Sequence, residues 1–171
     1  RTPLFTYGMV IAHLGCAVSL AGMAADSAFT VEKLVAARPG DVIETAGWKV
    51  RFDAITPIAG DNWTALQGDM TASRGSGSPI DIHPQARFFT APPTNTTEAA
   101  LLTRWDGQLY VVLGQEADDG RWQVRIWWKP FVTLIWLGGM MIALGGTLSL
   151  LGRERRGWLQ KLRRRSAVAA A

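Results

Sequence analysis

The sequence predicts membrane-spanning α-helices that enclose an extramembrane all-β domain, which is either a small antiparallel barrel or a sandwich. Two uncharged apolar stretches of 21 residues, at 4–24 and 131–151, stand near the two ends of the 171-residue chain. Between them, apolar and polar residues alternate over several short segments, which is typical of half-buried strands. Because Cys16 is the only cysteine, no intrachain disulfide can form, and the β domain must be stabilised by packing alone.

The first apolar stretch, within residues 1–24, has the length of a transmembrane helix. It contains no Asp, Glu, Lys or Arg between residues 4 and 24, and as an α-helix it would extend about 31 Å, close to the thickness of the hydrocarbon core. Small residues recur along it and predict a surface for close approach of another helix: Gly8, Ala12, Gly15, Cys16 and Ala17. The chain starts with Arg1 rather than Met, so we expect a fragment of a longer protein.

His13 is the one ionisable side chain of the 4–24 stretch apart from Tyr7 and Cys16, and it lies at its middle. An imidazole at this depth needs a compensating partner. One interpretation is a hydrogen bond to a neighbouring helix. The other is ligation of a haem iron, for which a neutral imidazole nitrogen in apolar surroundings is well suited. The local pattern leaves both interpretations open.

Residues 25–129 are predicted to form the β domain. In residues 41–54, Trp48, Val50 and Phe52 alternate with charged residues, which predicts a strand with one solvated face. Further strands are expected at 62–72, 108–114 and 122–128, with a loop at 74–79 and a hairpin connection at 118–120. Pro84 interrupts the alternation of residues 79–89, so that segment is expected to be an edge strand or a bent strand.

Residues 130–152 are predicted to form the final membrane helix, with Pro130 in its first turn, where a missing N–H costs nothing. Three tryptophans cluster at the outer end of this stretch, and an interfacial aromatic belt is expected to account for most of them: Trp127, Trp128 and Trp136.

The distribution of charge predicts the orientation of the chain. Residues 153–171 form a basic tail, with seven Lys or Arg residues against Glu154 alone, whereas residues 25–129 carry ten bases and thirteen acids. The positive-inside rule therefore places both ends in the cytoplasm and the middle domain outside, in the periplasm of a bacterium. Because the basic charge stands beside a membrane helix, anionic lipids are its expected partner and nucleic acid is not.

Motifs for common enzyme chemistry are not found in the sequence. It contains no phosphate-binding loop, no paired catalytic carboxylates and no nucleophile elbow. His83 stands beside Asp81 and Pro84, but no second His or Cys has metal-ligand spacing to it.

Several stretches, in order, resemble the C-terminal portion of the CcmF family, the cytochrome c maturation haem lyase membrane subunit. They cover nearly the whole chain before the basic tail: YGMVIAHLGCAVSLAG (7–22), RPGDVIETAGWKVRF (38–52), GDNWTALQGDM (60–70), HPQARFFTAPPTNTTEAAL (83–101), QLYVVLGQ (108–115) and WKPFVTLIWLGGMMIALGGTLSLLGR (128–153). The resemblance implies a multi-helix protein of the bacterial inner membrane with a periplasmic β-rich domain.

The resemblance also implies a function. The family contributes to covalent attachment of haem to apocytochrome c, and its expected partners are the periplasmic haem chaperone, apocytochrome c and other cytochrome c maturation subunits. By position, His13 matches an axial ligand of a membrane haem b, whose second axial ligand comes from an upstream helix that is not in this chain. The family's haem-handling segment is also upstream, so we expect no lyase activity from this fragment alone.

The chain departs from the family pattern at some positions. Gln85 and Ala86 stand where the family commonly has Glu and Lys, while Arg87 is kept. Trp63 replaces a usual Tyr and conserves a large amphipathic ring. Arg87 and Glu98 are interpreted either as a structural pair or as a docking contact.

Two other classes of function remain open at this point. In the first, the chain is a non-catalytic, membrane-anchored docking module for the haem chaperone or assembly partners, and His13 is a packed polar residue. In the second, it is a piece of a transporter. Haem absorbance separates the haem-binding hypothesis from the docking hypothesis, and solute flux would be needed to support the transporter hypothesis.

Overall fold

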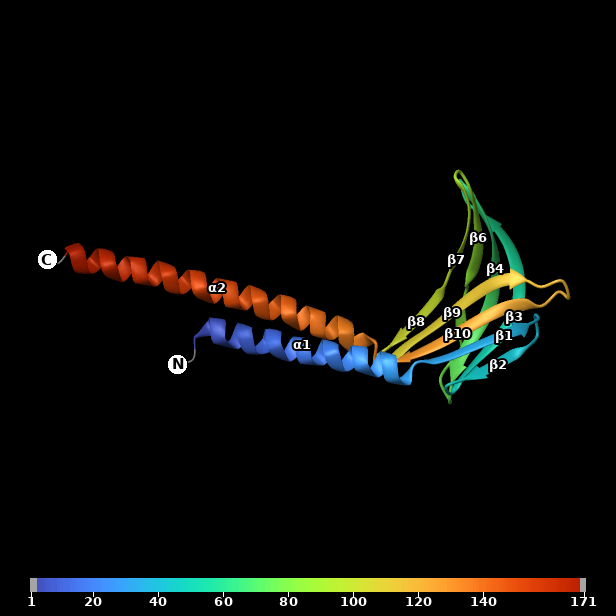
Figure 1. Cartoon of the computed structure of the whole chain (residues 1–171), viewed down its shortest axis with the longest axis horizontal. Coiled ribbons are helices and arrows are strands. Elements are labelled where there is room, and N and C mark those ends of the chain that lie inside the picture. Colours follow the sequence, from blue (N-terminus) through green and yellow to red (C-terminus); the bar gives the residue numbers. More distant parts are fainter. Residues whose placement is uncertain (1–2, 170–171) are drawn as a thin grey trace. The chain divides into compact units, whose positions relative to one another are not determined.

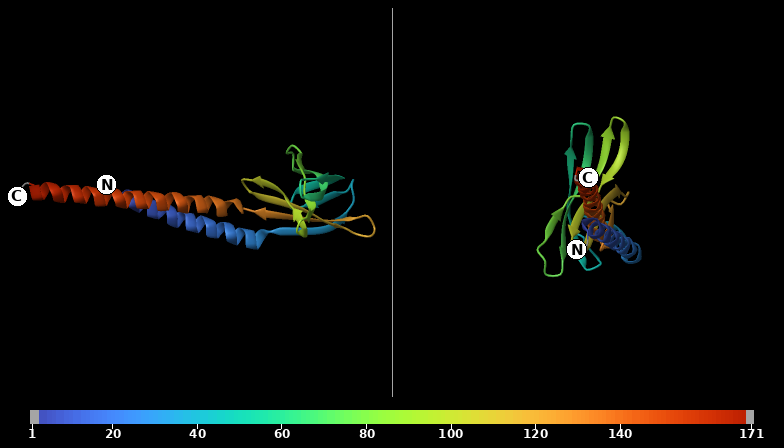
Figure 2. Two further views of the ribbon diagram at one scale, coloured as in Figure 1. Left: turned by 90° about the horizontal axis from the view of Figure 1, so that it is seen from above. Right: turned by 90° about the vertical axis from the view of Figure 1, so that its left-hand side faces the viewer.

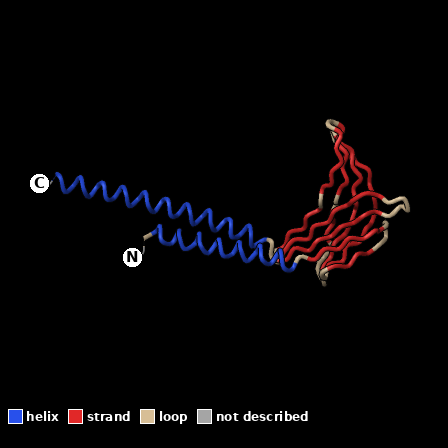
Figure 3. Tube along the Cα trace, in the orientation of Figure 1, coloured by secondary structure: helices blue, strands red, loops and turns tan. Residues whose placement is uncertain are grey.

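The structure is a computed structural model that describes the backbone of residues 3–169 and the side chains of residues 3–153. The chain divides into two compact units. One contains the two helices, and the other, Asp26–Phe131, contains all the described strands (Figures 1 and 3).

The helical unit is an antiparallel pair formed by α1 (Leu4–Phe29) and α2 (Thr133–Ala169), which lie side by side (Figure 2). Both helices are longer than the apolar stretches that predicted them. In α2 the segment Thr133–Arg153 is long and apolar enough to cross a membrane. The predicted basic tail, residues 153–171, continues as helix to Ala169, but its side chains after Arg153 lie outside the described residues.

The contact between the helices is made by glycines spaced seven residues apart. Gly8, Gly15 and Gly22 are the buried residues of α1, and they face α2 at the level of Ser149, Gly138 and Ile135. The predicted close-approach surface is therefore confirmed for Gly8, Gly15 and Ala12, which lies against Gly145. It is wrong for Cys16 and Ala17, which are exposed, because they project to the side of α1 that α2 does not cover.

The β domain consists of two antiparallel sheets and is a sandwich, one of the two predicted alternatives. The four-stranded sheet has the order β1 (Val31–Ala37), β10 (Trp122–Pro130), β9 (Gly107–Glu116), β8 (Ala100–Arg104). The six-stranded sheet has the order β2 (Val42–Thr45), β3 (Trp48–Ala59), β4 (Trp63–Arg74), β6 (Gln85–Thr90), β7 (Pro93–Glu98), and β5 (Ile80–Ile82) pairs with β4 (Figure 1).

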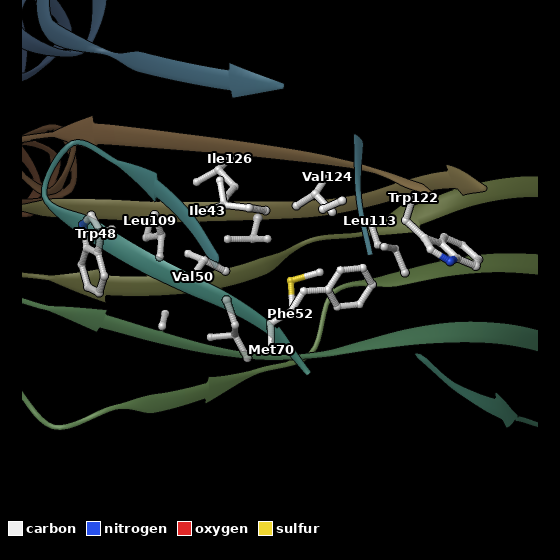
Figure 4. Close-up of a cluster of buried hydrophobic side chains, with 14 of the residues drawn as sticks. Ile43, Trp48, Val50, Phe52, Met70, Leu109, Leu113, Trp122, Val124 and Ile126 are labelled. Atoms are coloured by element: carbon white, nitrogen blue, oxygen red, sulfur yellow. The ribbon is translucent and has the colours of Figure 1, made fainter. Parts of the chain in front are cut away.

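The core lies between the two sheets (Figure 4). Every second residue of the long strands points inward, because side chains alternate across a strand. The fully buried side chains include Trp48, Val50, Phe52 and Met70 from one sheet and Leu109, Val111, Leu113, Val124 and Ile126 from the other.

Two predicted boundaries differ from the structure because of prolines. Residues 79–89 form two strands, β5 and β6, which are separated by His83 and the fully buried Pro84. Pro130 is not in the first turn of a helix: it ends β10, where it pairs with Gly107. The next residue, Phe131, has a φ of 57° and donates its N–H to the Asp106 carbonyl, so α2 begins only at Thr133.

The predicted aromatic belt is also divided between different environments. The prediction of an interfacial location is wrong for Trp128, which is only 6% exposed and belongs to the core. Its ring centroid lies 5.7 Å from that of Trp48. Trp127 lies on the outer face of the four-stranded sheet and makes an edge contact with Tyr110, its partner across β9. Trp136 is exposed on α2.

Candidate functional site

His13 is exposed on α1, and its tautomer follows from its hydrogen bond. The Nδ1 atom lies 2.7 Å from the carbonyl oxygen of Met9, one turn earlier in the same helix. A carbonyl oxygen can only accept, so Nδ1 must carry the proton. In the neutral ring the lone pair of Nε2 is then available to a metal ion or to a donor.

The face of α1 that carries His13 is opposite the face that carries the glycines. His13 is two residues from Gly15, which corresponds to about 200° around the helix axis. Because Gly15 packs against α2, the imidazole projects away from α2. The sequence left open a hydrogen bond between His13 and a neighbouring helix, whereas the bond in the structure is to its own helix.

In the β domain the structure brings together the three other candidate residues, Trp63, Arg87 and Glu98. They come from β4, β6 and β7, and the register places them diagonally across neighbouring strands, with Ala65 opposite Arg87 and Gln85 opposite Glu98. The Arg87 guanidinium carbon lies 4.3 Å from the centroid of the Trp63 ring, and Arg87 Nη2 forms an ion pair with Glu98 Oε2.

Arg87 is therefore held on several sides. Its Nε donates to Gln85 Oε1 at 2.8 Å, its Nη2 pairs with the Glu98 carboxylate, and its guanidinium stacks on the Trp63 ring. Its side chain is 23% exposed, against 52% for Glu98. Stacking of a guanidinium on an indole with a simultaneous carboxylate contact is a geometry that Lys cannot reproduce. The cluster fixes the β4, β6 and β7 strands to one another on this face.

A chain of polar side chains extends from Arg87 across the same face, and the sequence did not reveal it. Gln85 Nε2 donates to Gln67 Oε1, and Gln67 Nε2 donates to Asp69 Oδ1 at 2.8 Å. Asp69 also accepts from the Thr56 hydroxyl and lies 3.0 Å from His83 Nδ1. The Thr56 hydroxyl, followed by Gln67 and His83, lowers the pKa of the Asp69 carboxyl below its ordinary value. The available signal was the polar pair Gln67 and Asp69 at alternate positions of β4.

The opposite face of these strands borders a groove of about 700 Å³. Its lining is mostly apolar and includes Pro57, Leu66, Ala86, Phe88, Asn95, Thr97, Gly114 and Gln115. Phe88 and Leu66 are 43% and 38% exposed, although they continue the inner face of the six-stranded sheet. The last pair between β8 and β9 is Ala100 with Val111, so in the described strands the end of β9 has a partner only in β10. The groove thus combines apolar side chains with an open strand edge.

The described residues bring no three His, Cys, Asp or Glu side chains together in an arrangement that could hold a metal ion. What the two units offer chemically is an imidazole with a free Nε2 atom on a helix and an apolar groove beside a fixed arginine on a sandwich. The first suits ligation of a haem iron, and the second suits recognition of a polypeptide.

Comparison with known proteins identifies relatives that match most of the chain. The CcmF C-terminal beta-sandwich family matches residues 28–130. The cytochrome c-type biogenesis protein CcmF of Pseudomonas aeruginosa is 36% identical over 150 residues, which cover 88% of this chain and 23% of the relative. CycK of Rhizobium meliloti is 37% identical over 154 residues, with 90% and 23% covered. CcmF of Escherichia coli is 34% identical over 150 residues, with 88% and 23% covered.

A solved structure described as "Cytochrome c Heme Lyase CcmF" has the same fold. Its TM-score with this chain is 0.69 at 18% identity, and the match covers 84% of this chain and 24% of that one. The chain spans less than a quarter of the length of the curated relatives, 23% in each of the three cases. On the family match and these relatives, the chain belongs to the CcmF family and corresponds to its C-terminal portion.

Proposed function

We propose that this chain is the C-terminal part of a haem lyase subunit for biogenesis of c-type cytochromes, in which His13 is one axial ligand of a haem b. The observation that carries the proposal is the hydrogen bond from His13 Nδ1 to the Met9 carbonyl, on a helix face that α2 leaves uncovered. The second axial ligand would come from an upstream helix outside this chain. The curated relatives are named as cytochrome c-type biogenesis proteins, which agrees with this role.

The residues present fit such a ligand. Metal-bound histidines usually donate their second ring N–H to a carbonyl or carboxylate, which fixes the ring and makes the ligating nitrogen more basic. Here the Met9 carbonyl is that acceptor, so His13 would bind iron through Nε2. A bound haem b would supply one-electron transfer that keeps the delivered haem reduced for attachment to apocytochrome c. The role of this chain is to ligate and orient that group.

We further propose that the protein lies in the bacterial inner membrane, with the β domain in the periplasm. Leu4–Phe29 and Thr133–Arg153 are each long and apolar enough to span the bilayer. The excess of Lys and Arg in residues 153–171 over the acidic middle of the chain supports a cytoplasmic location for both ends.

The groove supports a second function, docking of a partner polypeptide from the maturation system, such as the haem chaperone, apocytochrome c or another subunit. An extended segment could pair with the open edge of β9 and place apolar side chains against Phe88 and Leu66. Three acidic residues close to the groove in sequence, Asp61, Glu116 and Asp118, would favour a basic segment.

The visible absorption spectrum of the complete subunit, purified with His13→Ala, tests the haem proposal. Loss of the low-spin haem b spectrum, with recovery on addition of imidazole, is expected if His13 is a ligand. His83→Ala is the matched control, because His83 lies on the sandwich and contacts Asp69. A spectrum of His13→Ala identical to that of the wild type would overturn the ligand role.

Neighbouring phenylalanines of β6 allow a test of the docking proposal. Phe88 lines the groove, whereas Phe89 pairs with Trp63 and points to the other face of the strand. Phe88→Ser should weaken binding of a labelled apocytochrome c peptide to the purified subunit by about tenfold, the loss typical of one apolar anchor. Phe89→Ser should leave it unchanged. Equal effects of both substitutions, or of neither, would contradict docking in the groove.

A further inference from the structure

Trp105 is the most exposed of the large apolar side chains in the described part of the chain, at 82%. It stands in the two-residue turn between β8 and β9, where Gly, Asn and Asp are the usual residues. A turn needs no indole for its geometry. The large exposed ring at the tip of a hairpin therefore requires another explanation.

The turn that carries Trp105 is firmly held. The next residue, Asp106, accepts from Arg74 Nη1 at 2.5 Å through its carboxylate and from the Phe131 N–H at 2.9 Å through its carbonyl. Gly107 follows with a φ of 154°, and a Cβ atom there would lie 2.5 Å from the Lys129 carbonyl. The turn that carries Trp105 is thus fixed next to the end of β10, where Gly107 pairs with Pro130.

The end of β10 is also where the chain leaves the β domain for α2. Phe131, which is 43% exposed, precedes the first residue of α2, Thr133, by two positions. Two residues can span at most about 7 Å. Chain connectivity alone therefore keeps Phe131, and with it the Asp106 carbonyl that it bonds, close to the start of the predicted membrane span.

The connection between α1 and β1 also carries exposed apolar side chains. Phe29 and Val31, where α1 passes into β1, are 64% and 42% exposed, and Val31 pairs with Trp128 next to the end of β10. We call four exposed apolar residues of the unit Asp26–Phe131 the junction patch: Phe29, which ends α1, and Val31, Trp105 and Phe131. Arg104 and Lys129 are their basic neighbours in sequence.

We propose that the junction patch is a membrane-interface anchor, in which Trp105 inserts into the lipid headgroup layer of the bilayer that α2 crosses. Tryptophan favours this layer because its ring is apolar and its N–H can reach polar groups. Arg104 and Lys129 lie 3.8 Å from the carboxylates of Asp106 and Asp26 and still suit anionic headgroups. The closer partner of the Asp106 carboxylate is Arg74. The hairpin turn would then hold the β domain at a fixed height and tilt on the membrane. This proposal rests on the proposed membrane location of the helices.

Depth-dependent fluorescence quenching tests the anchor in the complete subunit. With native cysteines replaced, Trp105→Cys, Ser76→Cys and Leu144→Cys would each be labelled with an environment-sensitive fluorophore in nanodiscs that contain brominated lipid. Ser76 is an exposed residue of the loop between β4 and β5, and Leu144 is an exposed residue of α2. The label at position 105 should be quenched about threefold more than the label at position 76, as for a group in the interfacial layer.

The three labels distinguish failure of the anchor alone from failure of the membrane location of α2. Quenching at position 144 but not at position 105 would overturn the anchor while the membrane span stands, and would indicate that another protein segment or water covers Trp105. Absence of quenching at both positions would overturn the anchor together with the membrane location of α2. Quenching at 105 and 144 with little at 76 supports the proposal.

Discussion

Gly15 of α1 lies so close to Gly138 of α2 that a Cβ atom on Gly15 would stand 2.7 Å from the Gly138 carbonyl oxygen. The same relationship recurs one heptad away, where a Cβ on Gly8 would stand 2.5 Å from the Gly145 carbonyl. In a membrane, where apolar surface gains nothing by leaving lipid, such close backbone contact is a main source of helix association. The glycines therefore determine both that α1 and α2 pair and which face of α1 remains for His13.

Adjacent glycines of α2 provide a matched test of this packing. A Cβ on Gly138 would meet the Gly15 carbonyl at 2.5 Å, while one on Gly139 would meet nothing within 4 Å. Gly138→Ala should destabilise the helix pair by about 1–3 kcal/mol through overpacking. Gly139→Ala should be neutral or stabilise by up to about 1 kcal/mol, because Ala is the better helix former. Unfolding in mixed detergent micelles measures both, and equal midpoints for the two variants would refute the glycine contact.

Arg74 should be important for the stability of the sandwich. Its guanidinium carbon lies 4.4 Å from the Trp128 ring centroid, and Nη1 pairs with Asp106. Arg74→Ala would leave a half-buried carboxylate without its main partner, so a loss of about 2 kcal/mol is expected in chemical unfolding. Arg74→Lys should recover only part of it, since an ammonium cannot stack and pair at once. Arg51→Ala, which removes an exposed ion pair with Asp53, should change little. Similar losses in Arg74→Ala and Arg51→Ala would contradict this account.

Stability should depend on pH through Asp69. Its pKa is lowered in the folded domain, first by the Thr56 hydroxyl, so the ionised form contributes stability that is fully present above the unfolded pKa of about 3.9. This contribution is lost as the pH falls below that value and through the folded pKa. The difference in unfolding free energy between the wild type and Asp69→Asn should therefore shrink as the pH falls below about 4. The surface variant Asp118→Asn serves as the control, and a wild-type advantage that stays constant down to acid pH would be inconsistent with the lowered pKa.

The proposed topology can be tested by thiol labelling in intact cells. In a Cys16→Ser background, a cysteine in place of Ser76 should react with an impermeant reagent, because the loop after β4 is exposed on the proposed periplasmic domain. A cysteine in place of Ser166, in the basic C-terminal segment, should react only after the membrane is made permeable. The reverse pattern would place the β domain in the cytoplasm.

The sequence predicted the fold class because its longest strands alternate clearly. Trp48, Val50 and Phe52 in β3 are all buried, as their period of two indicates. Three strands were not predicted. Strand β7, Pro93–Glu98, is exposed along its whole length and is held by β6, so its polar residues show no alternation. Strands β1 and β8 are also at sheet edges, and each is mostly exposed or half-buried.

The sequence predicted which residues belong to the candidate site but not how they contact one another. Arg87 and Glu98 were singled out as a pair, but their contact and the stacking on Trp63 depend on the register of β4, β6 and β7, which the sequence does not specify. The sequence likewise did not reveal the hydrogen-bond acceptor of His13. Every residue inside a helix has a carbonyl four positions earlier, so this carbonyl gives no specific signal. The groove depends on where β8 stops pairing with β9, and no local pattern marks that point.

The axial-ligand role of His13 is the central claim, and His13→Met in the complete subunit tests it most directly. If His13 ligates the iron, replacement of the imidazole by a thioether should keep a low-spin haem but raise its reduction potential, because Met/His ligation favours the reduced state. Redox titration of the haem spectrum measures this shift, and His83→Met is the matched control. A His13→Met protein with the potential and spectrum of the wild type would show that His13 is not a ligand, and that its bond to the Met9 carbonyl serves only to satisfy the ring N–H within its own helix.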